Sequence, residues 1–596
     1  MANLPPLSPA RKLLYSVCLT LLTLAVVVGG LEIGLRLAGF GHDAAFLRRW
    51  RAPDGTLWWR ENRDFTLLYF PREIVRRPQP IRIPVEKSPE TFRIFVLGSS
   101  AAMGDPEASF SLSRALEKML SAAYPSVRFE VVNAAITAIN SHVVRRIAED
   151  CAEASPDLFI VYEGNNEVIG PFGPAAVIGP FARSALAIRT ATALRATRTG
   201  QLIEAAARRL GFARVDRTTW GGMSMFLDAA IAADDPRLVH TRRLFRENLE
   251  AIIDAARQAD AHTLLCTVIT NLRDFSHFRS VRDPSLSADA AARWDAHWQQ
   301  AADALATRKP AIAIEHLQAC AEIDPGHAET WFRLGRACLQ AGRDTEAAGH
   351  LQRALDLDTL RFRTDSGLNE AIRRLADSRP DDSSLVDLAA LAAESAAHHI
   401  PGDDLLYEHV HLNMQGTLLA AEALFQAVSR ELLRQGRISA LQAAPDPETI
   451  RSRLAFTIYE QALIQRELLA RFEKPPFNEK SDNRARLEHC RRVIAAADQI
   501  LSAPENTAAL ATLYQTALEA APTDWILQRN FGMFLLATGH PARAIPLLEQ
   551  AAAWIDDDPD TLLALARAHE AAGHGQEARR RLDQLRLLEP DYPGLP

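Results

Sequence analysis

The chain has 596 residues, more than one hydrophobic core usually organises, and this length predicts three or four separately packed units. Its composition, 48% hydrophobic and 24% charged, is typical of a folded protein and excludes a largely disordered one. The formal net charge is −7, so there is no basic excess and we do not expect nucleic acid as a partner.

The N-terminal region contains a candidate membrane span. Residues Leu13–Leu31 are apolar apart from Ser, Thr and Gly, and Arg11 and Lys12 precede them. About 20 such residues cross a bilayer core as a helix, and flanking positive charge stays on the cytoplasmic side. We predict a cytoplasmic segment at 1–12, a single-pass helix of the inner membrane at 13–35, and a periplasmic remainder. A cleaved signal peptide remains an alternative.

The cysteines predict neither a disulfide framework nor a metal site. They lack CxxC spacing, and the number outside the membrane segment is odd, so they cannot all pair within the chain. We expect no metal and no cofactor. The six are Cys18, Cys151, Cys266, Cys320, Cys338 and Cys490.

Short apolar runs then alternate with helical patterns, which is typical of βαβ units and predicts a parallel sheet over roughly residues 90–430. The predicted strands are Arg93–Ser100, Phe129–Ala135, Asp157–Gly164, His262–Thr270 and Ser384–Leu388. The predicted helices are Leu112–Tyr124, His142–Ala154 and Arg242–Gln258.

Two regions repeat a pattern every 34 residues, the period of tetratricopeptide repeats. One falls between the fourth and fifth predicted strands, with Trp331, Leu334, Gly335, Ala347, Leu351 and Ala354 in register. The other is C-terminal, where Phe531, Gly532, Ala544, Leu548 and Ala551 recur as Leu565, Ala566, Ala578, Leu582 and Leu585. Stacked helix pairs of this kind present a concave surface, so we expect a protein partner, with a structural spacer as the alternative.

Residues suited to ester chemistry follow the predicted strands. Ser100 lies in a Gly-Ser turn after the first strand, and Asn166 follows the third. Glu408 and His411 stand three residues apart, so the carboxylate can orient an imidazole that faces a serine. Since the carboxyl ends of parallel strands meet at one sheet edge, these groups can converge there. His409 and His411 could instead bind a metal, but no acidic or Cys/His cluster supports this.

In order and spacing these residues resemble the SGNH, or GDSL-like, hydrolase superfamily. Gly98, Ser100 and Gly104 match its first block, Gly164 and Asn166 its third, and His411 its fourth. The resemblance implies a flavodoxin-like three-layer α/β/α fold, with Ser100 as nucleophile, His411 as base and Glu408 as the acid of the triad. It also implies an oxyanion hole formed by the backbone N–H groups of Ser100 and Ala138 and the Asn166 amide.

Three positions depart from the family pattern. Ser99 replaces its first-block aspartate, Ala138 stands where its second-block glycine is expected, and Glu408 replaces the last-block aspartate. The first is not a catalytic position. The methyl group of Ala138 could narrow the pocket, and the longer Glu408 must approach His411 differently.

We therefore predict a membrane-anchored serine esterase that acts on an acylated small molecule, glycan or lipid. An O-acyltransferase on an envelope polysaccharide and a non-enzymatic assembly scaffold remain alternatives. The segments after the membrane helix are predicted as a linker at 36–90, the hydrolase domain at 91–290 and 379–435, inserted repeats at 291–378, a helical connector at 436–490 and C-terminal repeats at 491–596.

Overall fold

The computed structural model describes residues 8–176, 183–210, 221–480, 482–590, 592, 594 and 595, so part of the predicted cytoplasmic segment 1–12 lies outside the described residues. The chain packs into two units. The first consists of Met1–Phe46, Asn62–Arg77 and Ala182–Trp220, and the second of Leu47–Glu61, Pro78–Phe181 and Gly221–Pro596.

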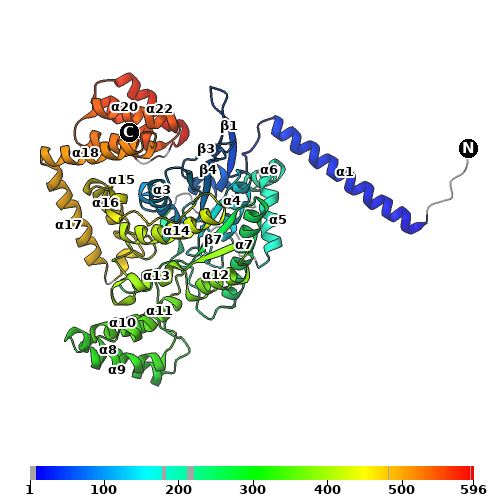
Figure 1. Ribbon diagram of the computed structural model, residues 1–596. Helices are drawn as coiled ribbons and strands as arrows, with labels where there is room; N and C mark the ends of the chain where they lie inside the picture. The colour runs from blue at the N-terminus through cyan, green and yellow to red at the C-terminus, as the bar shows by residue number, and fades with distance from the viewer. Residues whose placement is uncertain are drawn as a thin grey trace, which may run out of the picture. The chain divides into compact units, whose positions relative to one another are not determined.

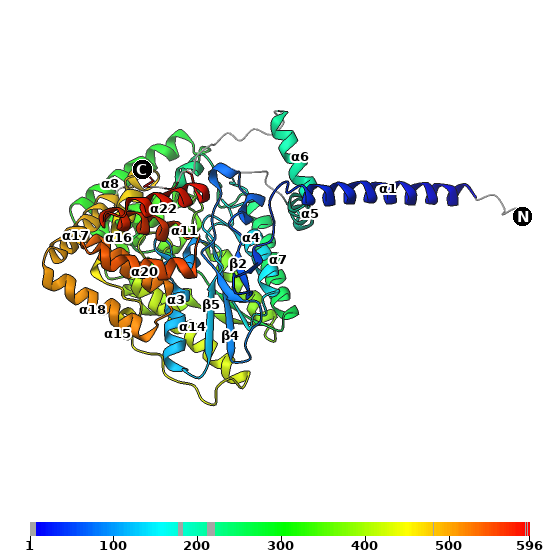
Figure 2. The ribbon, with the colours of Figure 1, turned by 90° about the horizontal axis from the view of Figure 1, so that it is seen from above.

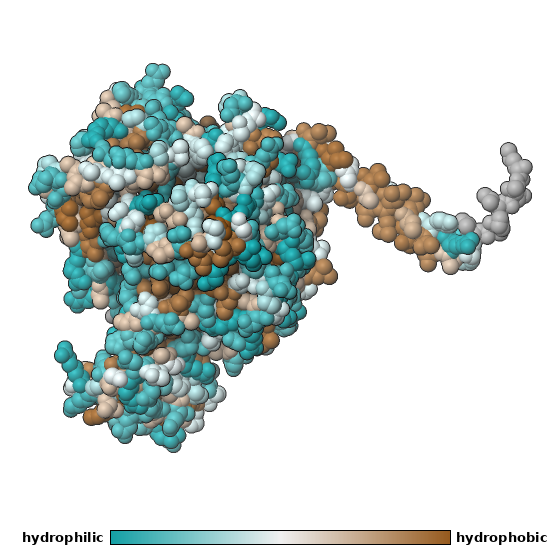
Figure 3. Space-filling view, viewed as in Figure 1, coloured by the Kyte–Doolittle hydropathy of each residue, from teal (hydrophilic) through white to brown (hydrophobic). Residues whose placement is uncertain are grey.

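The first unit is built around a long apolar helix, α1 (Pro9–Leu37), whose residues are mostly hydrophobic (Figure 3). Within the described part of the chain it is the one helix long and apolar enough to cross a membrane, and it buries none of its side chains. This is compatible with a single-pass anchor or a signal sequence. The Glu32 carboxylate accepts hydrogen bonds from the first backbone N–H groups of α6 (Arg198–Arg209). The unit also contains α5 (Ala185–Ala196) and the short helices η1 (Phe65–Leu68) and η2 (Arg72–Ile74).

The second unit contains the predicted parallel sheet, with five strands in the order β5-β4-β6-β7-β8. This mixed α/β architecture confirms the sequence prediction of a parallel sheet. Each predicted strand ends two to four residues later than the observed one, because the chain turns before the apolar run is complete. The strands are β4 (Thr91–Gly98), β5 (Arg128–Asn133), β6 (Leu158–Tyr162), β7 (His262–Cys266) and β8 (Ser383–Val386).

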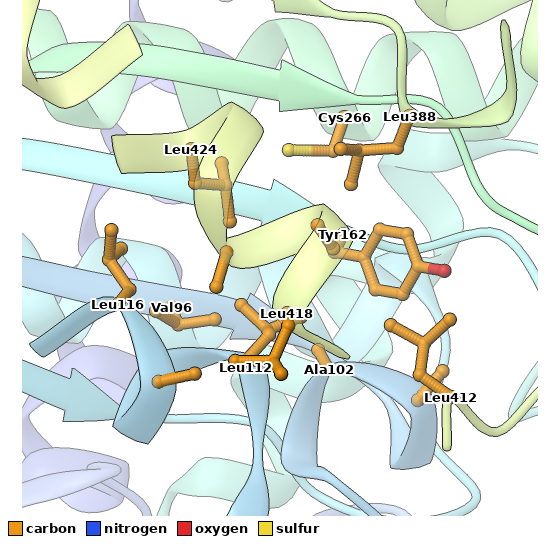
Figure 4. Packing of buried hydrophobic residues seen from close by; sticks show 14 of the residues in the cluster. Val96, Ala102, Leu112, Leu116, Tyr162, Cys266, Leu388, Leu412, Leu418 and Leu424 are labelled. Carbon is orange, nitrogen blue, oxygen red and sulfur yellow. The ribbon is translucent and has the colours of Figure 1, made fainter. Parts of the chain in front are cut away.

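Helices cover both faces of the sheet (Figures 1 and 2). On one face, alternate residues of β4, β6 and β7 pack against α3 and α14, as Figure 4 shows for Val96, Tyr162, Leu116 and Leu424. Helix α4 packs against α7, and both contact strands of the sheet. The bounds are α2 (Ser100–Met103), α3 (Leu112–Ala123), α4 (Ser141–Ala152), α7 (Pro236–Gln258), α12 (Ser366–Ser378), α13 (Leu388–Ser395) and α14 (Met414–Arg434), with η3 (Ala108–Phe110), η4 (Gly222–Phe226) and η5 (Ala397–His399).

Three further strands lie in the segment that the sequence analysis treats as a linker. They form a small antiparallel sheet, β1 (Leu47–Arg51), β2 (Leu57–Glu61) and β3 (Arg82–Pro84). The arginine and tryptophan side chains of these strands stack on one another, with Arg82 also lying 4.5 Å from the Trp554 ring. Alternation of cationic and aromatic residues hides the apolar periodicity by which a strand is usually recognised.

The remaining helices of the second unit lie in two stretches of the chain. Between β7 and β8 the chain forms α8 (Ala288–Ala306), α9 (Pro310–Ile323), α10 (Ala328–Gln340) and α11 (Asp344–Asp356). After α14 it forms α15 (Pro447–Arg453), α16 (Ile458–Phe472), η6 (Phe477–Glu479), α17 (Asn483–Leu501), α18 (Pro504–Ala520), α19 (Trp525–Ala537), α20 (Pro541–Trp554), α21 (Pro559–Ala571) and α22 (Gly575–Leu588).

Candidate active site

Ser100 lies at the turn that follows the inner strand β4 and is the first residue of the short helix α2. A side chain on Gly98 would collide with the carbonyl oxygen of Tyr162 and come within 2.6 Å of Ala102 Cβ. Gly104, which ends α2, has φ +95°, and a Cβ there would lie 2.5 Å from Ser111 Cβ. The turn therefore needs glycine at both ends, for close approach and for a left-handed backbone.

The imidazole of His411 faces Ser100 from the opposite loop. The two residues are 311 positions apart in sequence, yet the Ser100 hydroxyl lies 2.9 Å from His411 Nε2. His411 Nδ1 hydrogen-bonds the carboxylate of Glu408, which is fully buried and also accepts the backbone N–H of His411 at 3.3 Å. This pairing selects the tautomer that carries the proton on Nδ1 and leaves Nε2 free to accept from the serine.

Apolar packing supports the backbone on both sides of this contact. Ala102 and Leu412 lie close to Ser100 and His411 in sequence, and Figure 4 shows them in the same cluster with Tyr162 and Leu418. Burial lowers the pKa of His411 to about 4, although Asp105 acts in the opposite direction. The imidazole is therefore neutral at pH 7 and able to accept a proton.

Asn166 and Ala138, the two other predicted oxyanion donors, belong to neighbouring loops at the same edge of the sheet. The Asn166 amide donates to the carbonyl of Ile139, the residue after Ala138, at 2.9 Å. The same loop is tied to the end of β4, where Ile136 N donates to Gly98 O at 3.3 Å. Ala138 itself has φ +62°, a left-handed conformation in which a Cβ costs roughly 1–2 kcal/mol.

Two charged residues that the sequence analysis missed also contact His411. Asp105 Oδ2 lies 3.2 Å from His411 Nε2, and Arg471 of α16 holds both Asp105 oxygens at 3.0 and 2.9 Å. Asp105 could have been suspected, since it follows the Ser100 turn directly. Arg471 lies 60 residues beyond His411 in an ordinary amphipathic helix, and nothing in its local sequence marks it.

A pair of buried glutamates flanks Asn166 and was likewise missed. Glu167 accepts hydrogen bonds from the backbone N–H and the hydroxyl of Ser141, both at 2.7 Å. Burial raises the pKa of Glu167 to about 7 and raises that of Glu163 well above its ordinary value, with the neighbouring Glu167 charge adding to the latter. Through Ser141, the Glu167 carboxyl group connects the Asn166 loop to α4.

Potential metal ligands gather elsewhere. Within the described part of the chain, one group of three, Cys338, Glu346 and His350 on α10 and α11, has its ligand atoms within 4.8 Å of one another. His409 and His411 do not form such a group, and both histidines turn a ring nitrogen to Glu408.

Comparison with protein families confirms the predicted repeats. Models of the tetratricopeptide repeat match residues 299–360, in the α8–α11 region, and residues 535–594, in the α19–α22 region. Tetratricopeptide repeats are a class that commonly binds proteins. No curated protein matches the chain.

The solved structures that resemble the chain include distant matches. An acetyl xylan esterase, AlAXEase, has 12% identity and a TM-score of 0.26, with 56% of this chain and 100% of that chain covered. PilW, a type IV pilus biogenesis factor, has 12% identity and a TM-score of 0.16, covering 52% and 97% of the two chains. At such scores the matches establish neither fold nor function.

Proposed function

We propose that the chain is a membrane-anchored, extracytoplasmic serine esterase of the SGNH kind. The observation that carries this proposal is the 2.9 Å contact between Ser100 Oγ and His411 Nε2, with Glu408 on the other ring nitrogen of His411. A nucleophile, a base and a group that orients the base are the parts that acyl transfer requires. The strand order, with the first strand of the sheet flanked by the second and third, is that of flavodoxin-like folds and adds support.

In the proposed reaction Ser100 attacks the carbonyl carbon of an ester while His411 Nε2 accepts the hydroxyl proton. The carbonyl oxygen becomes an oxyanion, for which the backbone N–H groups of Ser100 and Ala138 and the second N–H of the Asn166 amide are the proposed donors. The protonated His411 then gives its proton to the leaving alkoxide, and an acyl-enzyme and an alcohol result. Water, deprotonated by His411, then attacks the acyl carbon. The bond between that carbon and Ser100 Oγ breaks, the acid leaves, and His411 returns the proton to Ser100 Oγ.

The helix α1 and the repeats complete the proposal. As an uncleaved anchor, α1 would hold the enzyme at the membrane surface, and the repeats would bind a protein partner there. Acylated glycans or lipids of the cell envelope are the substrates that this location favours.

The test uses full-length protein in detergent, a fluorophosphonate probe and short p-nitrophenyl esters. Wild type is expected to be labelled and to hydrolyse the esters, and Ser100→Ala to lose both, by about 10³-fold or more in turnover. Ser121→Ala, an exposed serine on α3, is the matched control and should behave as wild type. Absence of labelling in folded wild-type protein, or equal labelling of Ser100→Ala, would contradict the proposal.

A further inference from the structure

The proposed reaction leaves one charged pair of the site without a role. Asp105 faces the same nitrogen of His411 that faces the serine, at 3.2 Å, and Arg471 binds both oxygens of Asp105. The Arg471 guanidinium also reaches to 3.5 Å from His411 Nδ1. A carboxylate and a guanidinium that bind each other therefore both lie within 3.5 Å of one imidazole.

The positions of both side chains are set by packing. Asp105 follows Gly104, whose left-handed backbone turns the chain away from α2. Arg471 extends from the last turn of α16, a helix that contributes Ile464, Leu468 and Phe472 to the large apolar cluster of the second unit. The side chains of Arg471 and Asp105 are only 20% and 19% exposed, so water screens their charges weakly.

Two carboxylates and one cation lie against the imidazole. Glu408 lies on its own loop, Asp105 comes from the Ser100 side, and Arg471 comes from α16 together with Glu467, which contacts Arg471 at 3.7 Å. The neighbouring His409 ring is neutral, because burial, and then repulsion from the basic groups around it, lower its pKa well below the ordinary value. Arg471 keeps its charge: burial acts to lower its pKa, but the carboxylates, Asp105 foremost, raise it overall.

This arrangement matters when His411 has taken the proton of Ser100. The Nε2–H bond then points at two acceptors, the serine oxygen and Asp105. A carboxylate alone would hold the imidazolium and delay return of the proton to the leaving group. A guanidinium on that carboxylate weakens its hold and also opposes positive charge on the ring.

Resting on the proposed function, we propose that Asp105 and Arg471 are positioning residues for the proton that His411 carries. Asp105 accepts the Nε2–H hydrogen bond of the imidazolium, and Arg471 limits how strongly Asp105 retains it. The proton itself stays on nitrogen until it passes to the leaving alkoxide.

A purely structural pair, one that only ties α16 to the Ser100 loop, predicts a different result on mutation. Loss of such a tie would lower stability and turnover at every pH. Loss of the proposed electrostatic role moves the acid limb of activity, because the proton affinity of His411 changes. Removal of Arg471 exposes His411 to an uncompensated carboxylate and raises its pKa, whereas removal of the Asp105 charge lowers it.

The experiment measures kcat/KM against pH for p-nitrophenyl ester hydrolysis by the full-length protein. Arg471→Met should move the acid limb up by about 1–2 pH units, Asp105→Asn should move it down by about 1, and the double variant should lie between them. Arg471→Lys keeps the positive charge but loses one of the two hydrogen bonds to Asp105. Its pH profile should therefore stay close to that of the wild type. Arg466→Met removes an exposed arginine of the same helix, paired with Asp498 at 2.6 Å, and should leave the profile unchanged.

A second measurement does not depend on catalysis. Deuterium exchange at the imidazole C2 position, read by mass spectrometry of fragments that separate His409 from His411, gives the titration midpoint of His411 in each variant. Hydrolysis with an unmoved midpoint and acid limb in all the variants would overturn the charge-pair proposal and leave the esterase standing. If the His411 midpoint moves as expected but the protein neither hydrolyses esters nor is labelled, the esterase proposal is overturned. The effect of Asp105 and Arg471 on the proton affinity of His411 then still stands.

Discussion

The inserted repeats, α8–α11, and the C-terminal repeats, α19–α22, use the same residue type at the same contact between paired helices. A Cβ on Gly335 of α10 would lie 2.6 Å from Leu351 Cγ of α11, and a Cβ on Gly532 of α19 would lie 2.6 Å from Leu548 Cγ of α20. Both glycines let the helices approach closely. The two regions therefore share one kind of helix–helix contact.

Their attachments to the rest of the second unit differ. The C-terminal repeats present Asp524, whose side chain is 7% exposed, to Arg114 at 2.6 Å and Lys118 at 2.5 Å on α3. The inserted repeats attach through more exposed pairs, such as Asp344 with His398 and Arg336 with Asp274. Burial gives the first kind of attachment a much larger effect on stability than the second.

Different parts of the chain also support the two members of the proposed Ser100–His411 pair. Arg529 of α19 hydrogen-bonds Ser109, within the chain segment that joins the Ser100 turn to α3. On the other side, Arg363, which follows the inserted repeats, donates to the carbonyl of Asn271, whose side-chain amide donates to the carbonyl of Glu408. The C-terminal repeats thus contact the support of Ser100, and the segment that follows the inserted repeats contacts the support of His411.

The largest expected effect comes from removing the buried attachment. Asp524→Ala leaves Arg114 and Lys118 buried without their anion, and we expect a loss of about 3–5 kcal/mol in the free energy of unfolding. Asp344→Ala, at the exposed attachment, should cost less than about 1 kcal/mol. Urea unfolding followed by circular dichroism compares the two, and equal losses would show that burial does not distinguish the attachments.

Substitution of the two glycines tests whether the two repeat regions share the same helix–helix contact. Gly335→Ala and Gly532→Ala each force a methyl group against a leucine, so each should cost about 1–3 kcal/mol, and the two costs should agree within about 1 kcal/mol. Gly349→Ala in α11 is the control, since a Cβ there meets nothing within 4 Å and alanine favours the helix. This variant should be slightly stabilised. A much larger cost at one of the two paired glycines would contradict the likeness.

The two sides of the molecule should respond to acid through different groups. The pKa of His411, lowered to about 4 chiefly by burial, predicts that kcat/KM is flat from pH 7 to 5 and halves near pH 4. An imidazole with the ordinary value of about 6.5 would already have lost roughly thirty-fold at pH 5. On the C-terminal side, Arg114 and Lys118 outweigh burial and depress the pKa of Asp524. The stability that Asp524 contributes is therefore present above its unfolded pKa of about 3.9 and lost as pH falls through the lower folded value.

These two acid responses separate in one titration. Activity and the far-ultraviolet circular dichroism signal, followed together from pH 7 to pH 3, should show activity falling while the fold persists. Coincident loss of both signals would mean that unfolding, and not protonation of His411, sets the acid limb. A midpoint of activity near pH 6.5 in folded protein would contradict the effect of burial on His411.

Sequence patterns predict those parts of the molecule in which residues of one type recur at a regular spacing. The apolar runs of β4 to β8 and the 34-residue spacing of the repeats are of this kind, and both lead to the observed sheet and helix pairs. The convergence of Ser100 with His411 could be expected because both follow strands of one parallel sheet. The role of Arg471 could not be predicted, since its place in the site depends on how α16 packs. Strands β1–β3 could not be predicted either, because their arginine and tryptophan residues interrupt the alternation of apolar and polar residues.

The smallest expected effect concerns Ala138. Glycine at this position would remove the strain of a left-handed alanine, but it would also make the unfolded chain more flexible. These two effects oppose each other, so Ala138→Gly should change the free energy of unfolding by less than about 1 kcal/mol. Ala455, with φ +50° in the loop before α16, provides a matched control with the same strain away from the proposed oxyanion hole. If the backbone N–H of Ala138 serves the oxyanion, Ala138→Gly should change kcat for ester hydrolysis by no more than a few-fold while Ala455→Gly leaves it unchanged. The nitrogen remains in place in both variants, so a loss of more than ten-fold in Ala138→Gly would show that the methyl group, rather than the backbone, is needed for turnover.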